Sequence, residues 1–104
     1  MDYFKAVYRI LRFLKDSEIN DEFDSESFTA GHFGLTDRQW ASTLERLLDD
    51  GHAKGITITI GADGYAIVSL PHPMITSKGL EHLAGNAFMR RAANLAKGIR
   101  EILP

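Results

Sequence analysis

Side chains that can read the edges of DNA bases cluster between residues 36 and 50. Arginine pairs with guanine, glutamine pairs with adenine, and serine or threonine can contact either base. A spacing of three or four residues brings such side chains to one side of a helix. The candidate contact residues are Arg38, Gln39, Ser42, Thr43 and Arg46. This set predicts direct readout of double-stranded DNA by one helix.

Acidic residues on the same side of this helix favour a different use. Glu45 and Asp49 share its outward face and would repel phosphates. Asp49 and Asp50 also lie one turn away from Arg46 and can pair with it. A second interpretation therefore stays open, in which the helix is a spacer or a surface for contact with another protein.

The helix that carries these side chains has the clearest local signals in the chain. Thr36 and Gln39 have the spacing of a capping box, in which each side chain bonds the backbone of the other residue. Gly51 suits the left-handed residue just past a helix end. The apolar stripe consists of Trp40, Leu44, Leu47 and Leu48, with Ala41 at its edge. The sequence thus predicts an amphipathic helix over 36–50.

Two helices are predicted before this one. Asp2 caps a first helix that runs to about Asp16, with apolar residues at helical spacing. Residues 16–27 are acidic and rich in turn formers, so they predict a solvated loop. A short apolar-spaced run over 28–33 then predicts a short helix, which ends at a Gly-Leu turn.

After residue 50 the sequence changes to a hairpin pattern and then returns to helix. Residues 56–70 predict two strands around a turn at 61–64. This hairpin has no basic residue and carries Asp63 at its tip, so its role is expected to be architectural. Helices are predicted over 76–85 and over 86–103, the second capped by Asn86.

This order of elements is typical of a winged helix-turn-helix. We predict an α+β fold with a three-helix core, a β-hairpin wing and two additional C-terminal helices, in a single domain of residues 1–104. The helix-turn-helix spans 28–50, the wing 56–70 and the C-terminal helices 76–103. One core is expected to contain Trp40, Leu44, Leu47, Ile58 and Leu80.

Two further patterns each have two interpretations. Lys5, Arg9 and Arg12 share one arc of the first helix, either as a solvated face or as a stripe that contacts phosphates. The last helix carries an apolar seam with the spacing of a coiled coil, which packs on the first helix or forms a dimer. The seam consists of Phe88, Ala92, Leu95, Ile99 and Ile102. We predict a homodimer through this seam, with Tyr3, Ile10 or Phe13 contributing to the contact.

The net charge of −2 hides an uneven distribution. Residues 1–75 contain 7 Lys/Arg and 12 Asp/Glu, a balance of −5, whereas residues 76–104 contain 5 and 2, a balance of +3. Because dedicated nucleic-acid binders are more often basic overall, DNA binding is expected to be weak and strongly dependent on salt.

The sequence lacks the patterns that several other classes of protein require. It has no cysteine, and its 4 histidines have no ligand spacing, so no metal is expected. It has no nucleophile elbow, P-loop or dinucleotide-binding fingerprint, so neither an enzyme nor a cofactor is expected. It also has no long apolar run, and its first residues lack the layout of a secretory signal. These observations favour a cytoplasmic protein that is not an enzyme.

Residues 73–83, Pro-Met-Ile-Thr-Ser-Lys-Gly-Leu-Glu-His-Leu, resemble a motif of the YjcQ-like family, small winged-helix proteins of bacterial and prophage genomes. Asn86 and Arg90-Arg91 are similar to the capped last helix and paired basic residues of that family. Residues 47–55 resemble its link from recognition helix to wing. The resemblance implies a winged-helix fold, DNA binding and no catalytic activity. We therefore expect a small transcriptional regulator or prophage accessory factor; the alternative is a protein-interaction module that does not bind DNA.

Overall fold

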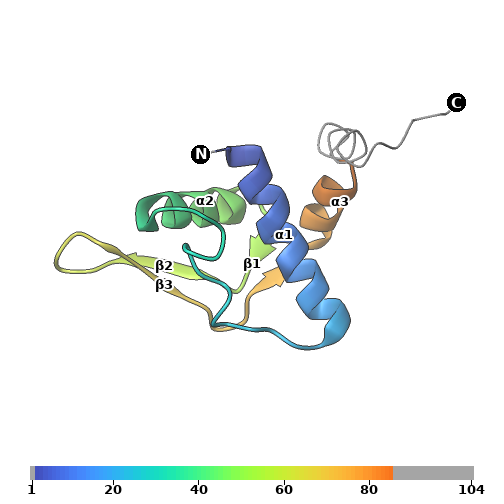
Figure 1. The fold of residues 1–104 in the computed structure, drawn as a ribbon, viewed down its shortest axis with the longest axis horizontal. Helices are drawn as coiled ribbons and strands as arrows, with labels where there is room; N and C mark the ends of the chain where they lie inside the picture. The colour runs from blue at the N-terminus through green and yellow to red at the C-terminus, as the bar shows by residue number, and fades with distance from the viewer. Residues whose placement is uncertain (1, 86–104) are drawn as a thin grey trace, which may run out of the picture.

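Three helices and two small antiparallel sheets make up the computed structural model, which describes residues 2–85 (Figure 1). The helices are α1 (Tyr3–Asn20), α2 (Asp37–Asp49) and α3 (Ser77–Gly85). The strands are β1 (Ala53–Lys54), β2 (Thr57–Ile60), β3 (Ala66–Ser69) and β4 (Met74–Ile75). The described residues therefore form an α+β fold, and along the chain all four strands come after α2 and before α3.

Helix α1 begins where predicted but continues to Asn20 rather than to Asp16. The Asp2 carboxylate accepts a hydrogen bond from the Lys5 backbone N–H at 3.1 Å and caps the first turn. Near the other end, Glu18 Oε2 accepts a hydrogen bond from the Ile75 backbone N–H of β4 at 3.2 Å. The predicted end was wrong because this acidic segment is held in the helix by a strand far away in the sequence.

The segment between α1 and α2 consists of turns and not of the short helix predicted over 28–33. Backbone N–H groups of Phe33 and Gly34 bond to the carbonyls of Ala30 and Gly31, both at 3.1 Å, and close successive turns. Phe28 is buried with Phe33. Their rings join an aromatic cluster that also contains Phe13, Phe23 and Trp40. Ring packing from a turn therefore buries the apolar residues that the sequence pattern assigned to a helix face.

The predicted hairpin is present, and it projects from the body of the protein past the end of α2 (Figure 1). Strands β2 and β3 pair antiparallel, with Ile58 opposite Val68 and Ile60 opposite Ala66. Ile58 and Val68 pack against the core. Because side chains alternate between the two faces of a strand, Ile60 and Ala66 lie farther out on this same face.

A second ladder, which the sequence did not predict, closes the base of the hairpin. Strand β1 pairs antiparallel with β4, with Ala53 opposite Ile75. The chain leaves β1 through Gly55, whose φ of +75° favours glycine. A side chain at Gly55 would also overlap the carbonyl oxygen of His72. These short strands connect the hairpin to α2 on one side and to α3 on the other.

Thr76 caps α3 and joins it to the turn after α2. Its hydroxyl accepts a hydrogen bond from the Gly79 N–H at 2.9 Å and donates one to the Gly51 carbonyl at 2.6 Å. Gly79 and Leu83 face the interior. Leu80 is 41% exposed, so its predicted place in the core is wrong. The side of α3 that carries Gly79 packs inward. Because successive residues of a helix are rotated by about 100°, Leu80 then points away from the interior.

The core lies where α1 and α2 meet the short β1–β4 ladder. Ile10, Leu11, Leu14, Leu44 and Leu47 are its largest fully buried apolar side chains. Trp40 is also buried, and Ile58 packs at the edge, as predicted. Within the described part of the chain there is one C-terminal helix, α3, where two were predicted. The other, over 86–103, lies outside the described residues.

Candidate nucleic-acid interface

Arg38, Ser42 and Arg46 form one exposed row along α2, which we call the α2 stripe. Residues four apart lie on the same side of a helix, about 6 Å from one another along its axis. The stripe therefore offers guanidinium groups at both ends and a hydroxyl between them to one ligand. Three of the five predicted contact residues share this surface.

The other two predicted contact residues face different surroundings. Gln39 Oε1 accepts a hydrogen bond from the Thr36 N–H at 3.0 Å, and the Thr36 hydroxyl accepts one from the Gln39 N–H at 3.1 Å. This capping box occupies the amide oxygen that recognition of adenine requires. Thr43 is only 2% exposed. Thr43 follows Trp40 by three residues and precedes Leu47 by four, so it shares their buried side, which does not favour the base contact predicted for it.

Arg46 packs against an aromatic ring instead of pairing with a carboxylate. Its guanidinium carbon lies 5.1 Å from the centroid of the Tyr3 ring. Asp49 and Asp50 lie close enough in the sequence to pair with Arg46, but neither carboxylate makes an ion pair with it in the described structure. Burial raises the pKa of the Tyr3 hydroxyl, and the charge of Arg46 partly opposes that rise. Tyr3 therefore positions the guanidinium on the α2 stripe without neutralising it.

The two sides of the α2 stripe differ in charge. On one side, a shallow hollow of about 390 Å³ is lined by Ser42 and Arg46 together with the carboxylates of Glu45, Asp49 and Asp50. On the other side is a hollow of about 410 Å³, which we call the Tyr3 pocket. It is lined by Tyr3, Arg38, Gln39, Ser42, Thr43 and Arg46. An anionic ligand would be repelled from the first hollow and attracted to the Tyr3 pocket.

The arginines of α1 mainly contact the protein itself. Arg9 donates to the carbonyls of His32 at 3.4 Å and Phe33 at 3.5 Å, and its guanidinium carbon lies 5.4 Å from the centroid of the Phe33 ring. Arg12 pairs with Asp16 at 3.4 Å on the helix surface. The interpretation of α1 as a phosphate-contacting stripe is therefore weakened, because Arg9 is used to attach the turn segment to α1.

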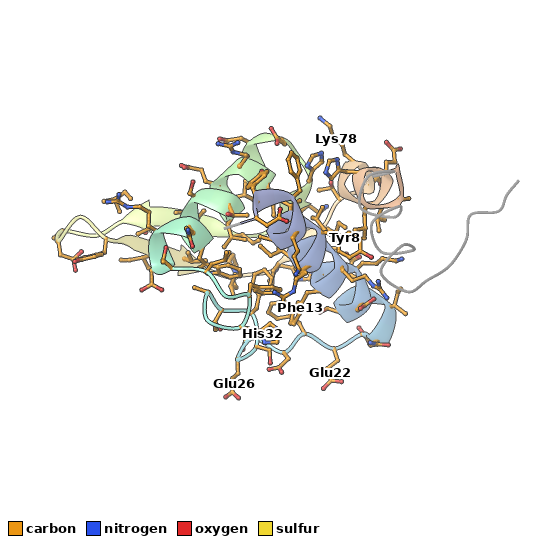
Figure 2. All side chains as sticks on the ribbon, turned by 45° about the horizontal axis from the view of Figure 1, so that its top comes forward. Tyr8, Phe13, Glu22, Glu26, His32 and Lys78 are labelled. Atoms are coloured by element: carbon orange, nitrogen blue, oxygen red, sulfur yellow. The ribbon has the colours of Figure 1, made fainter. Side chains whose placement is uncertain are left out.

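Arg9 holds the later part of the segment between α1 and α2, and acidic side chains lie in the earlier part of that segment. Figure 2 shows Glu22 and Glu26 pointing away from the body of the protein, on the stretch that leads from α1 toward His32. Both residues are exposed, as predicted for a solvated loop. A polyanion bound to this side of the protein would meet negative charge.

Residues 8–102 match the YjcQ protein family. The chain belongs to this family. The match includes all of α2, the hairpin and α3, and it confirms the resemblance seen in residues 47–55 and 73–83; Tyr3 precedes the matched region. No curated protein and no solved structure matches the chain.

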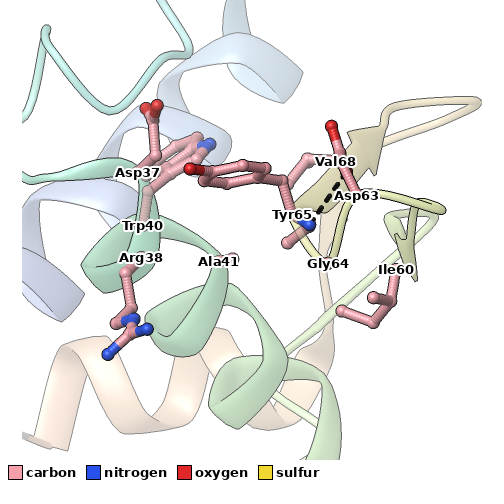
Figure 3. A pocket seen from close by; sticks show the side chains of 10 residues that line it. Asp37, Arg38, Trp40, Ala41, Ile60, Asp63, Gly64, Tyr65 and Val68 are labelled. Carbon is pink, nitrogen blue, oxygen red and sulfur yellow. Dashed lines mark hydrogen bonds between the residues drawn. The ribbon is translucent and has the colours of Figure 1, made fainter.

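In this member of the YjcQ family, the hairpin forms one wall of a groove, which we call the hairpin groove (Figure 3). Its volume is about 820 Å³, and its other wall is the N-terminal end of α2. The lining residues are Asp37, Arg38, Trp40 and Ala41 of α2 and Ile60, Asp63, Gly64, Tyr65, Ala66 and Val68 of the hairpin. Ile60 is 69% and Tyr65 is 73% exposed, so large apolar side chains remain uncovered here. The alternation of side chains along the strands did not indicate that the hairpin face that packs on the core would continue beyond the core.

Two histidines that are far apart in the sequence stack where α3 meets the turn after α2. The ring centroids of His52 and His82 are 4.4 Å apart, with an angle of 20° between the planes. Burial lowers the pKa of His52, and the charges of His82 and Lys78 lower it further, while that of Asp50 opposes them. The sequence separation of these residues concealed the pair.

Residues 2–85 contain neither a cluster of metal ligands nor a membrane-spanning helix. No group of three or more His, Cys, Asp or Glu side chains there could hold a metal ion. No helix of this part of the chain is long and apolar enough to cross a bilayer.

The residues predicted to form the dimer seam, Phe88, Ala92, Leu95, Ile99 and Ile102, lie outside the described residues. Their expected neighbours on α1 have other contacts. Ile10 is fully buried in the core, and Phe13 packs against Phe23 and Phe28. Of the three alternatives predicted for α1 (Tyr3, Ile10 or Phe13), Ile10 is therefore not available for a dimer contact, and Tyr3 lies against Arg46. The dimer itself stays a prediction.

Proposed function

We propose that this YjcQ family member is a cytoplasmic, non-enzymatic winged-helix protein that binds double-stranded DNA through the α2 stripe. Its role would be that of a small transcriptional regulator or a prophage accessory factor. The observation that supports DNA binding most directly is the Tyr3 pocket. There Arg38 and Arg46 face the same hollow, and among residues 2–85 none that lines it is a carboxylate.

The arrangement of α2 supports its assignment as the recognition helix. In a winged helix, the recognition helix enters the major groove with its N-terminal residues nearest the bases. We assign this role to α2, although the segment before it forms turns rather than the first helix of the helix-turn-helix predicted over 28–50. Arg38 lies in the first turn of α2 and is exposed. One side of α2 packs on α1 and β3, which leaves the side of the α2 stripe available to a duplex. In this proposal, the hairpin that follows α2 serves as the wing.

The same geometry predicts modest affinity. Each phosphate neutralised by a cation contributes about 0.9 to the slope of log affinity against log salt. The α2 stripe provides two arginines, of which Arg46 is assigned to a phosphate, so we expect a slope of roughly −1 to −2. This dependence on salt is weaker than the strong dependence expected from the sequence. Glu45 and Asp49 on the neighbouring side reduce the attraction further.

The proposal is tested by fluorescence anisotropy of the purified protein with labelled genomic and random-sequence duplexes, at low and at physiological salt. Arg38→Ala should cost about 1–3 kcal/mol on a preferred sequence if Arg38 reads a guanine. Arg46→Ala should weaken binding to all sequences to a similar extent, because it removes a phosphate contact. Arg12→Ala is the matched control, since it removes an exposed arginine outside the α2 stripe.

Two results would contradict this function. One is the absence of binding to any duplex at low salt. The other is equal weakening by Arg12→Ala and Arg38→Ala, which would indicate unspecific attraction to positive charge. Either result would favour the second candidate, a winged-helix module that binds protein rather than DNA. The hairpin groove, with its exposed Ile60 and Tyr65 and no basic residue on the hairpin, favours that candidate.

A further inference from the structure

The inner face of the hairpin extends beyond the core that it covers. Ile58 and Val68 pack on the core, but Ile60 and Tyr65 are mostly exposed in the hairpin groove. Water contact with large apolar side chains is unfavourable, so a segment that covers them gains hydrophobic free energy. The groove therefore favours an apolar ligand, and it shares only Arg38 with the α2 stripe.

The rim of the hairpin groove adds a preference for positive charge. Asp37 stands on the α2 wall and Asp63 on the hairpin wall, against one basic lining residue, Arg38. Asp63 is fixed in its turn, because Oδ1 accepts a hydrogen bond from the Tyr65 N–H at 3.0 Å, as Figure 3 shows. An apolar segment with basic side chains beside its apolar face matches this surface.

The chain itself contains such a segment after α3. Residues 86–104 have 4 Lys/Arg and one acidic residue, a balance of +3, whereas residues 1–85 have 8 and 13, a balance of −5. The segment also carries the apolar seam from Phe88 to Ile102. Arg91 precedes Ala92 by one residue and Leu95 by four, so on a helix it borders the seam. Both the apolar pattern and the charge complement the hairpin groove.

The position of α3 indicates that the segment comes from another molecule. Gly85 ends α3 on the opposite side of α1 from the hairpin (Figure 1). Phe88, the first residue of the seam, follows Gly85 by only three residues. We propose that residues 86–104 of one copy dock in the hairpin groove of a second copy. Reciprocal exchange of the two segments closes a two-fold dimer.

Sedimentation velocity on the full-length chain tests this dimer. Wild type should be dimeric at micromolar concentrations. Ile60→Asp, in the groove, should raise the dissociation constant about tenfold or more, as expected for loss of a central apolar contact. Ile67→Asp is the matched control, because Ile67 is 52% exposed on the outer face of the same hairpin. It should leave the dimer unchanged, and circular dichroism should show both variants folded.

Mixing two variants separates this arrangement from a dimer of seam against seam. Leu95→Asp disrupts the apolar seam of the segment and leaves the groove intact. Ile60→Asp disrupts the groove and leaves the segment intact. An equimolar mixture should recover dimers through the one intact groove and the one intact segment. A seam-to-seam dimer would be dissociated by Leu95→Asp, would ignore Ile60→Asp and would not be recovered by mixing. That pattern overturns the proposal.

Disulfide trapping gives a readout that does not depend on dimer stability. The chain has no cysteine, so Ala66→Cys in the groove and Ala92→Cys in the segment each introduce a single thiol. Mixing the two variants under mild oxidation should enrich the mixed disulfide over either symmetric one. A monomeric wild type would show that the segments are not exchanged between two copies. Formation of an intramolecular disulfide in a chain that carries both Ala66→Cys and Ala92→Cys would show the same. Failure of DNA binding would leave all these results unaffected, because none of the assays contains DNA.

Discussion

Replacing Gly79 with alanine should destabilise the protein although alanine is the better helix former. Gly79 lies in α3 and is buried against the turn after α2. An added Cβ would overlap the backbone carbonyl oxygen of His52 and approach Ile75 Cγ1 to 2.7 Å. The Ile75 side chain can move, but the His52 carbonyl belongs to the backbone and also accepts a hydrogen bond from Thr76 N–H at 3.1 Å.

The expected magnitude is the difference of two effects. Alanine gains about 1 kcal/mol over glycine inside a helix. Overpacking a buried site costs about 1–3 kcal/mol, and a rigid backbone neighbour places Gly79→Ala at or above the upper end of that range. The free energy of unfolding should therefore fall by about 2 kcal/mol. For a domain of this size that corresponds to a decrease in Tm of about 8–16 °C.

Gly85→Ala is the control within the same helix. Apart from the neighbouring residues of α3 itself, no atom of the described residues lies within 4 Å of the Cβ that it would add, so the stability should stay equal or rise by up to about 1 kcal/mol. Urea unfolding and thermal melts of the two variants, followed by circular dichroism, measure the difference. Equal stability of Gly79→Ala and Gly85→Ala would refute the close packing of α3 against the His52 carbonyl.

Further predictions concern the turn segment and the histidine pair. Arg9→Ala should lower the free energy of unfolding by about 1–2 kcal/mol, because the contacts of Arg9 with two carbonyls and the Phe33 ring are lost. Arg12→Ala is the control and should cost less than about 1 kcal/mol. Equal urea midpoints of the two variants would contradict the role of Arg9. His52 has a pKa below the ordinary 6.5, through burial first and then the charges of His82 and Lys78, with Asp50 opposing. Because the folded state binds fewer protons, stability should be full above about pH 6.5 and should fall as the pH drops below it. Melts from pH 7.5 to 5 should show this fall, and His52→Gln should reduce it; a wild-type Tm independent of pH would refute it.

Elements with short-range signals were predicted well from the sequence. The capping box of Thr36 and Gln39 placed the start of α2, and its apolar stripe placed Trp40, Leu44 and Leu47 in the core. The hairpin followed in the same way from strict alternation around a glycine turn. In each case the deciding interactions join residues a few positions apart, and such interactions are encoded in the local sequence.

Elements that depend on distant residues were predicted poorly. The apolar spacing over 28–33 suggested a helix, but Phe28 and Phe33 are buried by rings from α1 and α2 while the backbone forms turns. Leu80 seemed a core residue, but the close approach of Gly79 to His52 turned the other side of α3 inward. Spacing shows which residues share a face; it does not show what that face meets.

The candidate site divides in the same manner. The sequence by itself determined that Arg38, Ser42 and Arg46 lie on one side of α2, because the helical repeat depends only on the backbone. Only the tertiary structure decided that Tyr3 packs on Arg46, that Thr43 is buried and that Ile60 and Tyr65 extend past the core into a groove. Those results depend on how α1, α2 and the hairpin pack, and packing is a property of the whole chain rather than of any one segment.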